Sequence, residues 1–516
     1  MENFPLLEAT IFLPLLGAFV LLLIPEEEPE AIRGATLASA ILTFLASLPL
    51  LWLYDPAQGG FQITSSHEWL GPVGARFSLG VDGMSVLLIL LTTFLVPSAV
   101  LCSWRGITQR VKSFHVALLV MEAAMVGVFA ARDMLLFFLF FEVQLVPMFL
   151  FIGVWGAEER IKAAVKFFIY TAVGSLIMLA AILWIYGRAG WTFDLTTIES
   201  QLALLRQAQE NGFGPREQMW LCAAFALAFA IKVPLIPFHT WLPHAHVQAP
   251  TAGSVILAAV MLKMGGYGFV RFCLPLFPDG LVHETAAGFT LAGLLTWLGA
   301  LGVVYGAFMA LAQADLKRLI TYSSVSHLGL VVTGLFVGLT AVDLPGPGHG
   351  RAVAGAIYQM VAHGLSTGAL FFLVGSIYDR RHTKLIEKLG GLARPAPLLA
   401  TCFVMATLAS IALPGTAGFV GEILILVGSW ECNRLVAAIG ATGMVLGAAY
   451  MLWAVQRSFF GPTEGENRTV EDLDWIELLG VGPMLVMTFA MGLCPGPFLR
   501  LLEPTLNGLT RAYGGA

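Results

Sequence analysis

The sequence predicts an all-α polytopic membrane protein of about fourteen transmembrane helices. Of its 516 residues, 58% are hydrophobic and 12% are charged, and the mean hydropathy is +0.82. A soluble protein carries about 25% charged residues, so this chain has too few to cover a surface that faces water. A scan for apolar runs of about 20 residues, the length that crosses a bilayer, finds fourteen candidates. Composition and run length therefore agree on the class.

The fourteen expected spans, with approximate limits, are 4–24, 32–54, 84–104, 113–131, 133–154, 163–187, 218–239, 251–274, 285–310, 316–339, 352–378, 396–430, 435–459 and 475–497. An even number of spans places both termini on one side of the membrane. The first run carries Glu2 and Glu8 where a signal peptide needs positive charge, so we expect it to remain as the first span.

The connections between the spans contain no separate soluble domain, and we expect residues 1–516 to form a single membrane domain. The connection at 55–82 alternates weakly like a β-hairpin, 188–217 is polar and partly amphipathic, and 461–474 is acidic. About 15 Lys and Arg follow odd-numbered spans, against about 10 after even-numbered spans and in the tail. The positive-inside rule then predicts that both termini are extracytoplasmic.

Charge and cysteine patterns exclude several classes of function. The formal net charge of -5 is small, and no basic run suggests a nucleic-acid partner. Six cysteines occur without a C-x-x-C pair, which indicates neither a disulfide framework nor a thiolate metal site. No nucleotide-binding glycine pattern and no nucleophile–base pair is found. The surroundings that matter are therefore the lipid bilayer and other membrane proteins.

Two spans are interrupted by helix-breaking residues next to ionisable ones. Pro234 and Pro237 follow Lys232 in the seventh span, and the run 414–418 (PGTAG) precedes Glu422 in the twelfth. Proline removes a backbone donor and clashes with the preceding turn, so both helices must break. Broken backbone within a bilayer is tolerated where it faces protein or water. Spans 4–8 (113–274) and spans 9–13 (285–459) can be taken as two blocks of five. Each break then falls in the fourth span of its own block, as in inverted-repeat transporters.

Several ionisable side chains lie too deep in apolar runs to reach water easily. A charged residue at the centre of a membrane helix costs roughly 2.5 to 3.5 kcal/mol on insertion scales, so each needs a reason to be there. The candidates for proton transfer are Glu142, Lys232, Lys263, His327, His363 and Glu422. A static buried ion pair is the alternative for Glu142, Lys232 and Lys263. A satisfied core histidine is the alternative for His327 and His363. For Lys166 and Glu122, placed near helix ends, we expect snorkelling or interhelical pairing.

The choice of lysine over arginine favours proton transfer. The chain has 28 basic residues, of which 8 are lysine, and each arginine falls in a connection or at a span end. Arginine does not deprotonate in proteins, whereas burial can bring a lysine into a titratable range. If Glu142 lies near Lys232, its carboxylate favours the protonated lysine, and its withdrawal favours release of the proton.

Eight runs resemble the M-type antiporter-like membrane subunit of bacterial NADH:quinone oxidoreductase (complex I). They are GVDGMS, VLCSWRGI, FFEVQLVPMFLFIGVWG, RIKAAVKFFIYTAVGS, IKVPLIPFHTWLPHAH, QAPTAGSVILAAVMLKMGGYGFVRF, LAQADLKRLITYSSVSHLG and LPGTAGFVGE. The similarity extends over about residues 80–460. It implies fourteen helices, two inverted five-helix repeats and one proton channel. It also implies no bound cofactor or redox chemistry on this chain, and neighbouring antiporter-like membrane-arm subunits as partners in a bacterial inner membrane.

Carried over motif by motif, the resemblance gives each buried group a role. Glu142 matches the glutamate of the fifth helix, Lys232 the lysine of the broken seventh, and Lys263 the central lysine of the eighth. Glu422 matches the glutamate of the broken twelfth helix. The polar positions that link the two half-channels match His327 and His363.

Other functions remain as alternatives. Mrp-type cation/proton antiporter subunits and hydrogenase-linked ion-pumping subunits resemble this family but usually have lysine where Glu422 stands. A purely structural subunit would tolerate loss of the buried lysines. The loop histidines His239, His244 and His246 are possible entrance residues, and His244 replaces the aspartate that the family more often has. No fourth ligand accompanies them, so we expect no metal.

Overall fold

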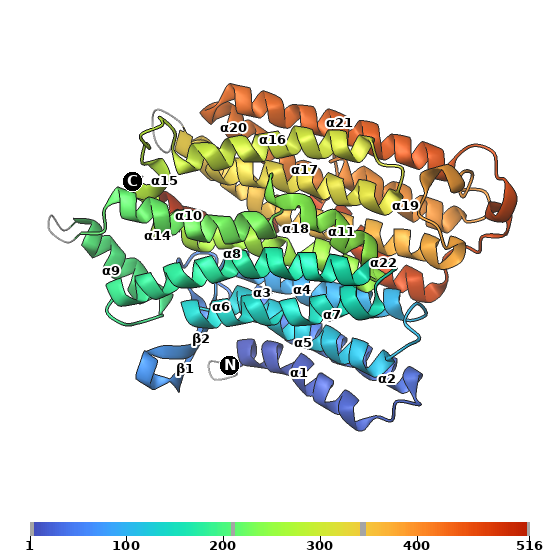
Figure 1. The fold of residues 1–516 in the computed structure, drawn as a ribbon, viewed down its shortest axis with the longest axis horizontal. Helices are drawn as coiled ribbons and strands as arrows, with labels where there is room; N and C mark the ends of the chain where they lie inside the picture. The colour runs from blue at the N-terminus through green and yellow to red at the C-terminus, as the bar shows by residue number, and fades with distance from the viewer. Residues whose placement is uncertain (1–4, 208–211, 341–346, 513–516) are drawn as a thin grey trace.

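Most of the chain is a bundle of long helices that run roughly parallel or antiparallel to one another (Figure 1). The computed structural model describes residues 5–207, 212–340 and 347–512. Within these ranges, 12 helices are long and apolar enough to cross a membrane. The chain is thus a multi-pass, all-α membrane protein, as the composition predicts.

The helices of the first half begin with α1 (Leu6–Leu23), α2 (Pro29–Ser47), α3 (Leu50–Leu53), α4 (Gly83–Ser103) and α5 (Val111–Ala130). They continue with α6 (Met134–Val143), α7 (Leu145–Trp155), α8 (Arg160–Arg188), α9 (Leu195–Gln207), α10 (Pro215–Lys232) and α11 (Trp241–Gln248). Next come α12 (Thr251–Ile256), α13 (Lys263–Gly268), α14 (Leu274–Leu276) and α15 (Pro278–Val282).

The second half contains α16 (Leu291–Leu311), α17 (Leu316–Phe336), α18 (Pro347–Arg381), α19 (Pro397–Ser410), α20 (Ala417–Cys432), α21 (Arg434–Phe459), α22 (Trp475–Leu493) and α23 (Gly496–Ala512). The longest, α18, lies inside the bundle, and the membrane-crossing part of this helix is buried along its length. It packs against α17 and α20 from the second half of the chain and against α12 and α4 from the first half. The centre of the bundle is therefore where the two halves of the chain meet.

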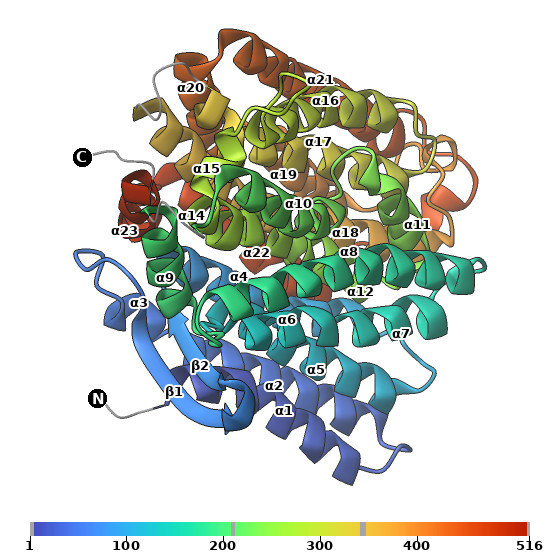
Figure 2. The same cartoon turned by 60° about the vertical axis from the view of Figure 1, so that its left-hand side comes forward.

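The hairpin expected at 55–82 is present. Strands β1 (Gln62–Leu70) and β2 (Ala75–Val81) pair antiparallel, and Gly74, with φ of 69°, closes the turn between them. The amphipathic connection expected at 188–217 contains α9. The hairpin, α9 and α23 all lie at one end of the bundle (Figure 2).

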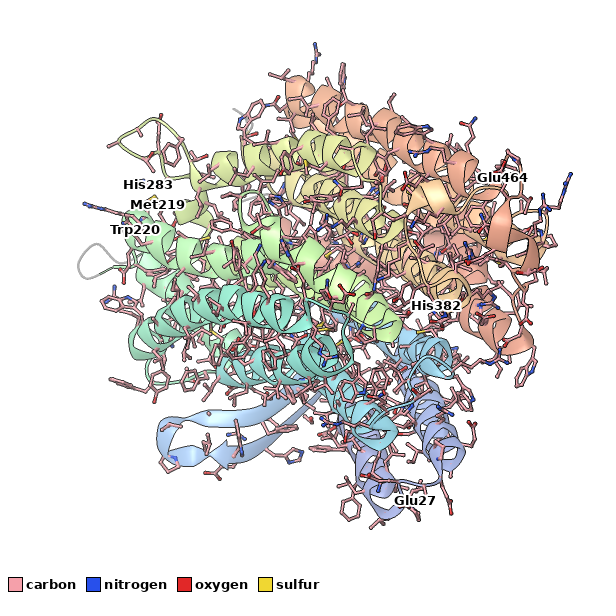
Figure 3. All side chains as sticks on the ribbon, turned by 45° about the vertical axis from the view of Figure 1, so that its right-hand side comes forward. Glu27, Met219, Trp220, His283, His382 and Glu464 are labelled. Carbon is pink, nitrogen blue, oxygen red and sulfur yellow. The ribbon has the colours of Figure 1, made fainter. Side chains whose placement is uncertain are left out.

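The long helices alternate in direction, so the bundle has two distinct ends. Figure 3 places Met219, Trp220 and His283 at one end and Glu27, His382 and Glu464 at the other. Helices α9 and α23 lie at the first of these ends (Figure 2), which we call the terminal end; we call the other the opposite end.

The two expected interruptions are present, and they divide the spans predicted at 218–239 and 396–430. Helix α10 ends at Lys232, short of the predicted limit of the seventh span. Residues 233–237 are not helical, and a 3-10 helix at Phe238–Thr240 then leads into α11. Residues 411–416 separate α19 from α20. Each of the blocks 113–274 and 285–459 contains one of these two breaks, and the inverted relationship of the blocks stays a prediction.

Candidate proton-transfer site

The breaks place two ionisable side chains deep inside the bundle. Lys232 is the last residue of α10 and is 2% exposed, and Glu422 lies in the second turn of α20 and is also 2% exposed. Because each helix stops or starts in mid-bundle, its terminal backbone groups lack intrahelical partners there. The sequence therefore puts a charged side chain and free backbone polar groups at the same depth.

A series of polar side chains connects Lys263 with Glu422 through the centre of the bundle. The Lys263 Nζ atom lies 2.8 Å from His363 Nδ1, and the ring centroids of His363 and His327 are 5.7 Å apart. His327 Nδ1 lies 2.9 Å from Glu422 Oε1, which also accepts a hydrogen bond of 3.0 Å from Gln359 Nε2. All five residues are buried. Groups that are nearly 100 residues apart in the chain thus form one continuous row.

Lys263 occupies an irregular part of its helix. π-Helical segments at Leu257–Met261 and Phe269–Cys273 flank α13, which begins at Lys263. Such segments are rare, occur often at functional sites and leave carbonyl groups out of the normal pattern. The Lys263 ammonium donates a hydrogen bond to the carbonyl of Ala258, five residues earlier. The local distortion thereby supplies a polar partner to a fully buried cation.

Glu142 and Lys232 lie close enough for their charges to interact, without forming a direct ion pair among the described residues. The Lys232 Nζ atom lies 4.6 Å from the centroid of the Phe141 ring, an arrangement that stabilises a cation. Ser175 is within hydrogen-bonding reach of the Glu142 carboxyl. The helix that carries Glu142 is interrupted at Gln144, between α6 and α7. The structure thus supports the expected neighbourhood of Glu142 and Lys232, at a longer separation than a salt bridge.

Lys232 and Lys263 are not joined by a hydrogen bond in the described part of the chain. Their helices nevertheless pack together, since a Cβ atom on Gly265 would lie 2.5 Å from a methyl group of Val233. The glycine therefore permits close approach of α13 to the end of α10. The pair Glu142–Lys232 and the central row (Lys263, His363, His327 and Glu422) are therefore adjacent but separate clusters.

The three histidines of the expected entrance lie in different surroundings. His239 packs edge-on against Tyr305, with ring centroids 5.2 Å apart, and His244 is half-buried. His246 is fully buried and stacks on Phe371 at 4.6 Å. No group of three or more His, Cys, Asp or Glu side chains within the described ranges is arranged to hold a metal ion.

The expectation for Glu122 is wrong. It lies near the middle of α5, is fully buried, and both of its carboxyl oxygens lack a hydrogen-bond partner in the described structure. Snorkelling is therefore impossible for this side chain. Lys166, in contrast, does pair between helices, since its Nζ atom donates to the carbonyl of Thr240 at 2.9 Å.

Sequence reasoning also missed polar residues that complete the row. Gln359 donates to Glu422 and lies four residues before His363 on α18, a spacing that puts both on one helix face. The four-residue spacing from His363 could have identified Gln359 from the sequence. Lys317 is buried at the opposite end of the bundle and donates to the carbonyl of Ala249 at 2.8 Å. Sequence reasoning did not select Lys317, because it lies at the start of its helix and not deep in an apolar run.

An all-α membrane bundle with two broken helices and a buried row of Lys, His and Glu defines the class of antiporter-like ion-translocating subunits. Comparison with known proteins gives the family. The family model described as "NADH:quinone oxidoreductase/Mrp antiporter, TM" matches residues 131–447. The chain belongs to this family.

Full-length relatives narrow the position of the chain within the family. It is 44% identical to NADH-quinone oxidoreductase subunit M of Rhodobacter capsulatus, over 99% of this chain and 97% of that protein. Among solved structures it is similar to a chain of respiratory complex I from Thermus thermophilus, with 33% identity, a TM-score of 0.86, and coverage of 99% and 100%. The Mrp complex from Dietzia has a chain with the same fold (TM-score 0.79), but at 23% identity, with coverage of 98% and 51%. The resemblance to the M type is thus confirmed over the whole chain.

Proposed function

We propose that this chain is the M-type, proton-translocating membrane-arm subunit of a respiratory NADH:quinone oxidoreductase, and that its protons pass along the central row. The observation that supports this most strongly is the row itself, in which Lys263, His363, His327 and Glu422 lie within reach of one another in the buried centre. Each of these groups can gain and lose a proton. The relatives with this sequence pattern are named as NADH-quinone oxidoreductase subunit M.

The composition of the row suits proton transfer better than a static scaffold. A scaffold is well served by arginine, which keeps its charge, whereas the row contains lysine, histidine and glutamate. In Lys263 and His363, the two atoms that face one another are both nitrogen. Two nitrogens at 2.8 Å share a single proton between them, because a protonated lysine and a protonated histidine would repel each other. A proton that arrives at one group therefore displaces one from the next.

The proposal places the redox chemistry on other subunits. The translocase activity is coupled to electron transfer elsewhere in the complex, and this chain supplies the path for protons without a cofactor of its own. The structural relatives are chains of respiratory complex I and of an archaeal respiratory membrane complex, which supports neighbouring membrane-arm subunits as the partners of this chain. A bacterial inner membrane is the location that follows.

A cation/proton antiporter of the Mrp type is the second candidate, and the Mrp chain shares the fold. Glu422, where Mrp-type subunits usually have lysine, argues against it. Extraction with mild detergent distinguishes the two. The proposed subunit co-purifies with peripheral subunits that carry flavin and iron–sulfur groups, and an Mrp-type subunit purifies without them.

Glu142 and Lys232 are expected to act as a unit. Glu142→Gln removes the charge that favours protonated Lys232, and Lys232→Ala removes the carrier, so each change alone strongly impairs proton pumping. The double variant is expected to be impaired little more than either single variant, with a coupling energy of about 1 to 3 kcal/mol. The measurement is proton uptake per NADH oxidised in vesicles containing the assembled complex.

A matched control for Glu142→Gln is Glu122→Gln, which changes another buried carboxyl on the neighbouring α5. Glu122 makes no described contact with the row, so near-normal pumping is expected. Strict additivity of Glu142→Gln and Lys232→Ala would show that the two residues have independent roles.

The orientation of the chain is expected to put both termini outside the cytoplasm. The basis is the excess of basic residues in the connections after odd-numbered spans. A reporter enzyme that is active only outside the cytoplasm is expected to be active when fused after Ala516 and inactive when fused in the connection at 461–474. The reverse pattern would contradict the proposed orientation.

A further inference from the structure

A second line of polar side chains leads from Lys263 toward the terminal end. Lys263 and Tyr267 are four residues apart on α13, so both lie on one helix face. Arg271 follows at the same spacing and donates from Nε to the Tyr267 hydroxyl at 3.2 Å. The helix that carries all three is buried along its whole membrane-crossing length. Polar groups therefore extend from the central lysine in a direction that the proposed path does not use.

This line ends at a cavity of about 310 Å³ at the terminal end. Polar and charged side chains that line it include Asp82, Arg132, Glu199, Arg271 and Thr505. It has room for several water molecules. Burial raises the pKa of Glu199, on the surface helix α9, to about 7, so a group in this cavity exchanges protons near neutral pH. The cavity thus resembles the mouth of a proton path.

The distance between this mouth and the central carrier is short. Eight residues separate Lys263 from Arg271, which is about 12 Å along a helix. A proton that moved between Lys263 and this cavity through Tyr267 would bypass His363, His327 and Glu422. Such a bypass would dissipate the gradient that the complex builds. A working pump must block it.

We propose that Arg271, held in place by Asp82, is an electrostatic barrier that keeps protons from passing between Lys263 and the cavity at the terminal end. This inference rests on the proposed role of Lys263 as a proton carrier. A guanidinium group does not release its proton in proteins, so Arg271 cannot serve as a relay. A fixed positive charge in a narrow path excludes protons and other cations.

Arg271 is held on several sides. One of its terminal nitrogens lies 2.7 Å from Asp82 Oδ1 and 3.3 Å from Ser85 Oγ, and the guanidinium lies 4.7 Å from the centre of the Phe61 ring. Tyr267 in turn donates to the carbonyl of Phe129 at 3.3 Å. The position of the positive charge is thereby fixed relative to the helix that carries Lys263.

Asp82 is itself anchored at the N-terminus of α4. It accepts hydrogen bonds from the Ser85 N–H at 2.9 Å and from the Thr505 hydroxyl of α23 at 3.0 Å. Burial alone would raise the pKa of Asp82, but the Arg271 charge and the Ser85 N–H outweigh burial and lower that pKa. The carboxylate stays ionised and keeps Arg271 in place.

The order of the two charges determines the effect on a proton. Arg271 contacts Tyr267, on the side of Lys263, whereas Asp82 lies beyond Arg271 and contacts α23. A proton coming from Lys263 therefore meets the positive member of the pair first. A proton at the Tyr267 hydroxyl lies 3.2 Å from the Arg271 Nε atom, and the more distant Asp82 carboxylate offsets only part of the repulsion. A net repulsion that slows proton passage about tenfold corresponds to about 1.4 kcal/mol.

The test uses the Asp82→Asn/Arg271→Met double variant, which removes both charges and leaves no unpaired buried ion. The whole complex is inserted into vesicles without NADH, a membrane potential is imposed, and proton entry is followed with a pH-sensitive dye. Passive proton entry is expected to rise at least about tenfold over wild type. Arg271→Lys keeps a positive charge, so its passive proton entry is expected to stay at the wild-type level. Arg132→Met changes the other cavity arginine, which faces Asp194 at 3.8 Å, and its proton entry is also expected to stay at that level.

A third substitution separates this inference from the proposed function. Adding Lys263→Ala to the double variant is expected to abolish the leak, because the leak passes through that lysine. A leak that persists without Lys263 would contradict its role as carrier. If the double variant assembled and let in no more protons than wild type, the barrier proposal would be wrong, and the proposed function would be unaffected.

Loss of assembly is covered by a second double variant, Asp82→Asn/Arg271→Gln, which retains hydrogen-bonding groups at both positions. Its expected result is the same leak. If neither double variant assembled while Arg271→Lys did, the pair would be needed for folding and the barrier proposal would fail.

Discussion

Glu422→Gln is expected to abolish at least about nine-tenths of the proton transfer that passes through this chain, with the complex still assembled. Glutamine has nearly the shape of glutamate, so it can keep the hydrogen bonds with His327 and Gln359 that Glu422 accepts now. An amide cannot take up a proton at neutral pH. The row would then end at His327, with no acceptor beyond it.

The measurement for Glu422→Gln is proton uptake per NADH oxidised, where the share of this chain is the difference between wild type and Lys263→Ala. Glu431→Gln is a matched control, because Glu431 lies on the same helix and forms a half-exposed ion pair with Arg351 away from the row. The control is expected to pump normally. Equal pumping by Glu422→Gln and wild type would remove Glu422 from the path.

Much of the architecture could be predicted from the sequence because the membrane imposes simple rules. Apolar runs of the right length identified the long helices, since backbone groups in lipid must be satisfied within a helix. Proline chemistry located both breaks, and α10 does end at Lys232, two residues before Pro234. These features are local, so a local pattern was enough.

The helix irregularities could not be predicted in the same way. The π-helical segments that flank Lys263 leave no compositional mark, because they arise from packing between helices. Gly265 and its contact with Val233 illustrate this point. A glycine in an apolar run is common, and its meaning appears when the neighbouring helix is in place. The interruption at Gln144, in contrast, had a signal that was overlooked, since Pro147, three residues later, removes a backbone donor.

The site was predicted as a list of residues and not as a geometry. Depth in an apolar run and resemblance to the family identified Lys263, His363 and Glu422, but the order in which they touch depends on contacts across 36 to 100 residues of chain. Glu122 was misjudged because its distance from the helix ends was underestimated. Arg271 was passed over because it lies close to the end of its span, where a charged side chain needs no explanation.

Lys263→Arg tests the central claim that Lys263 carries protons. The substitution keeps the positive charge, most of the side-chain length and the possibility of a hydrogen bond to His363 and the Ala258 carbonyl. A static role is therefore preserved, and near-normal assembly is expected. Arginine has a pKa above about 12, so release of its proton at pH 7 costs about 7 kcal/mol. Movement of one charge through 100 mV supplies about 2.3 kcal/mol, which is too little.

The most direct measurement is proton uptake into vesicles that contain the assembled complex with Lys263→Arg, normalised to NADH oxidation and compared with wild type and Lys263→Ala. The account predicts that the arginine variant assembles, and that its uptake per NADH falls to the level of the alanine variant. Wild-type uptake per NADH by the arginine variant would show that Lys263 does not carry protons.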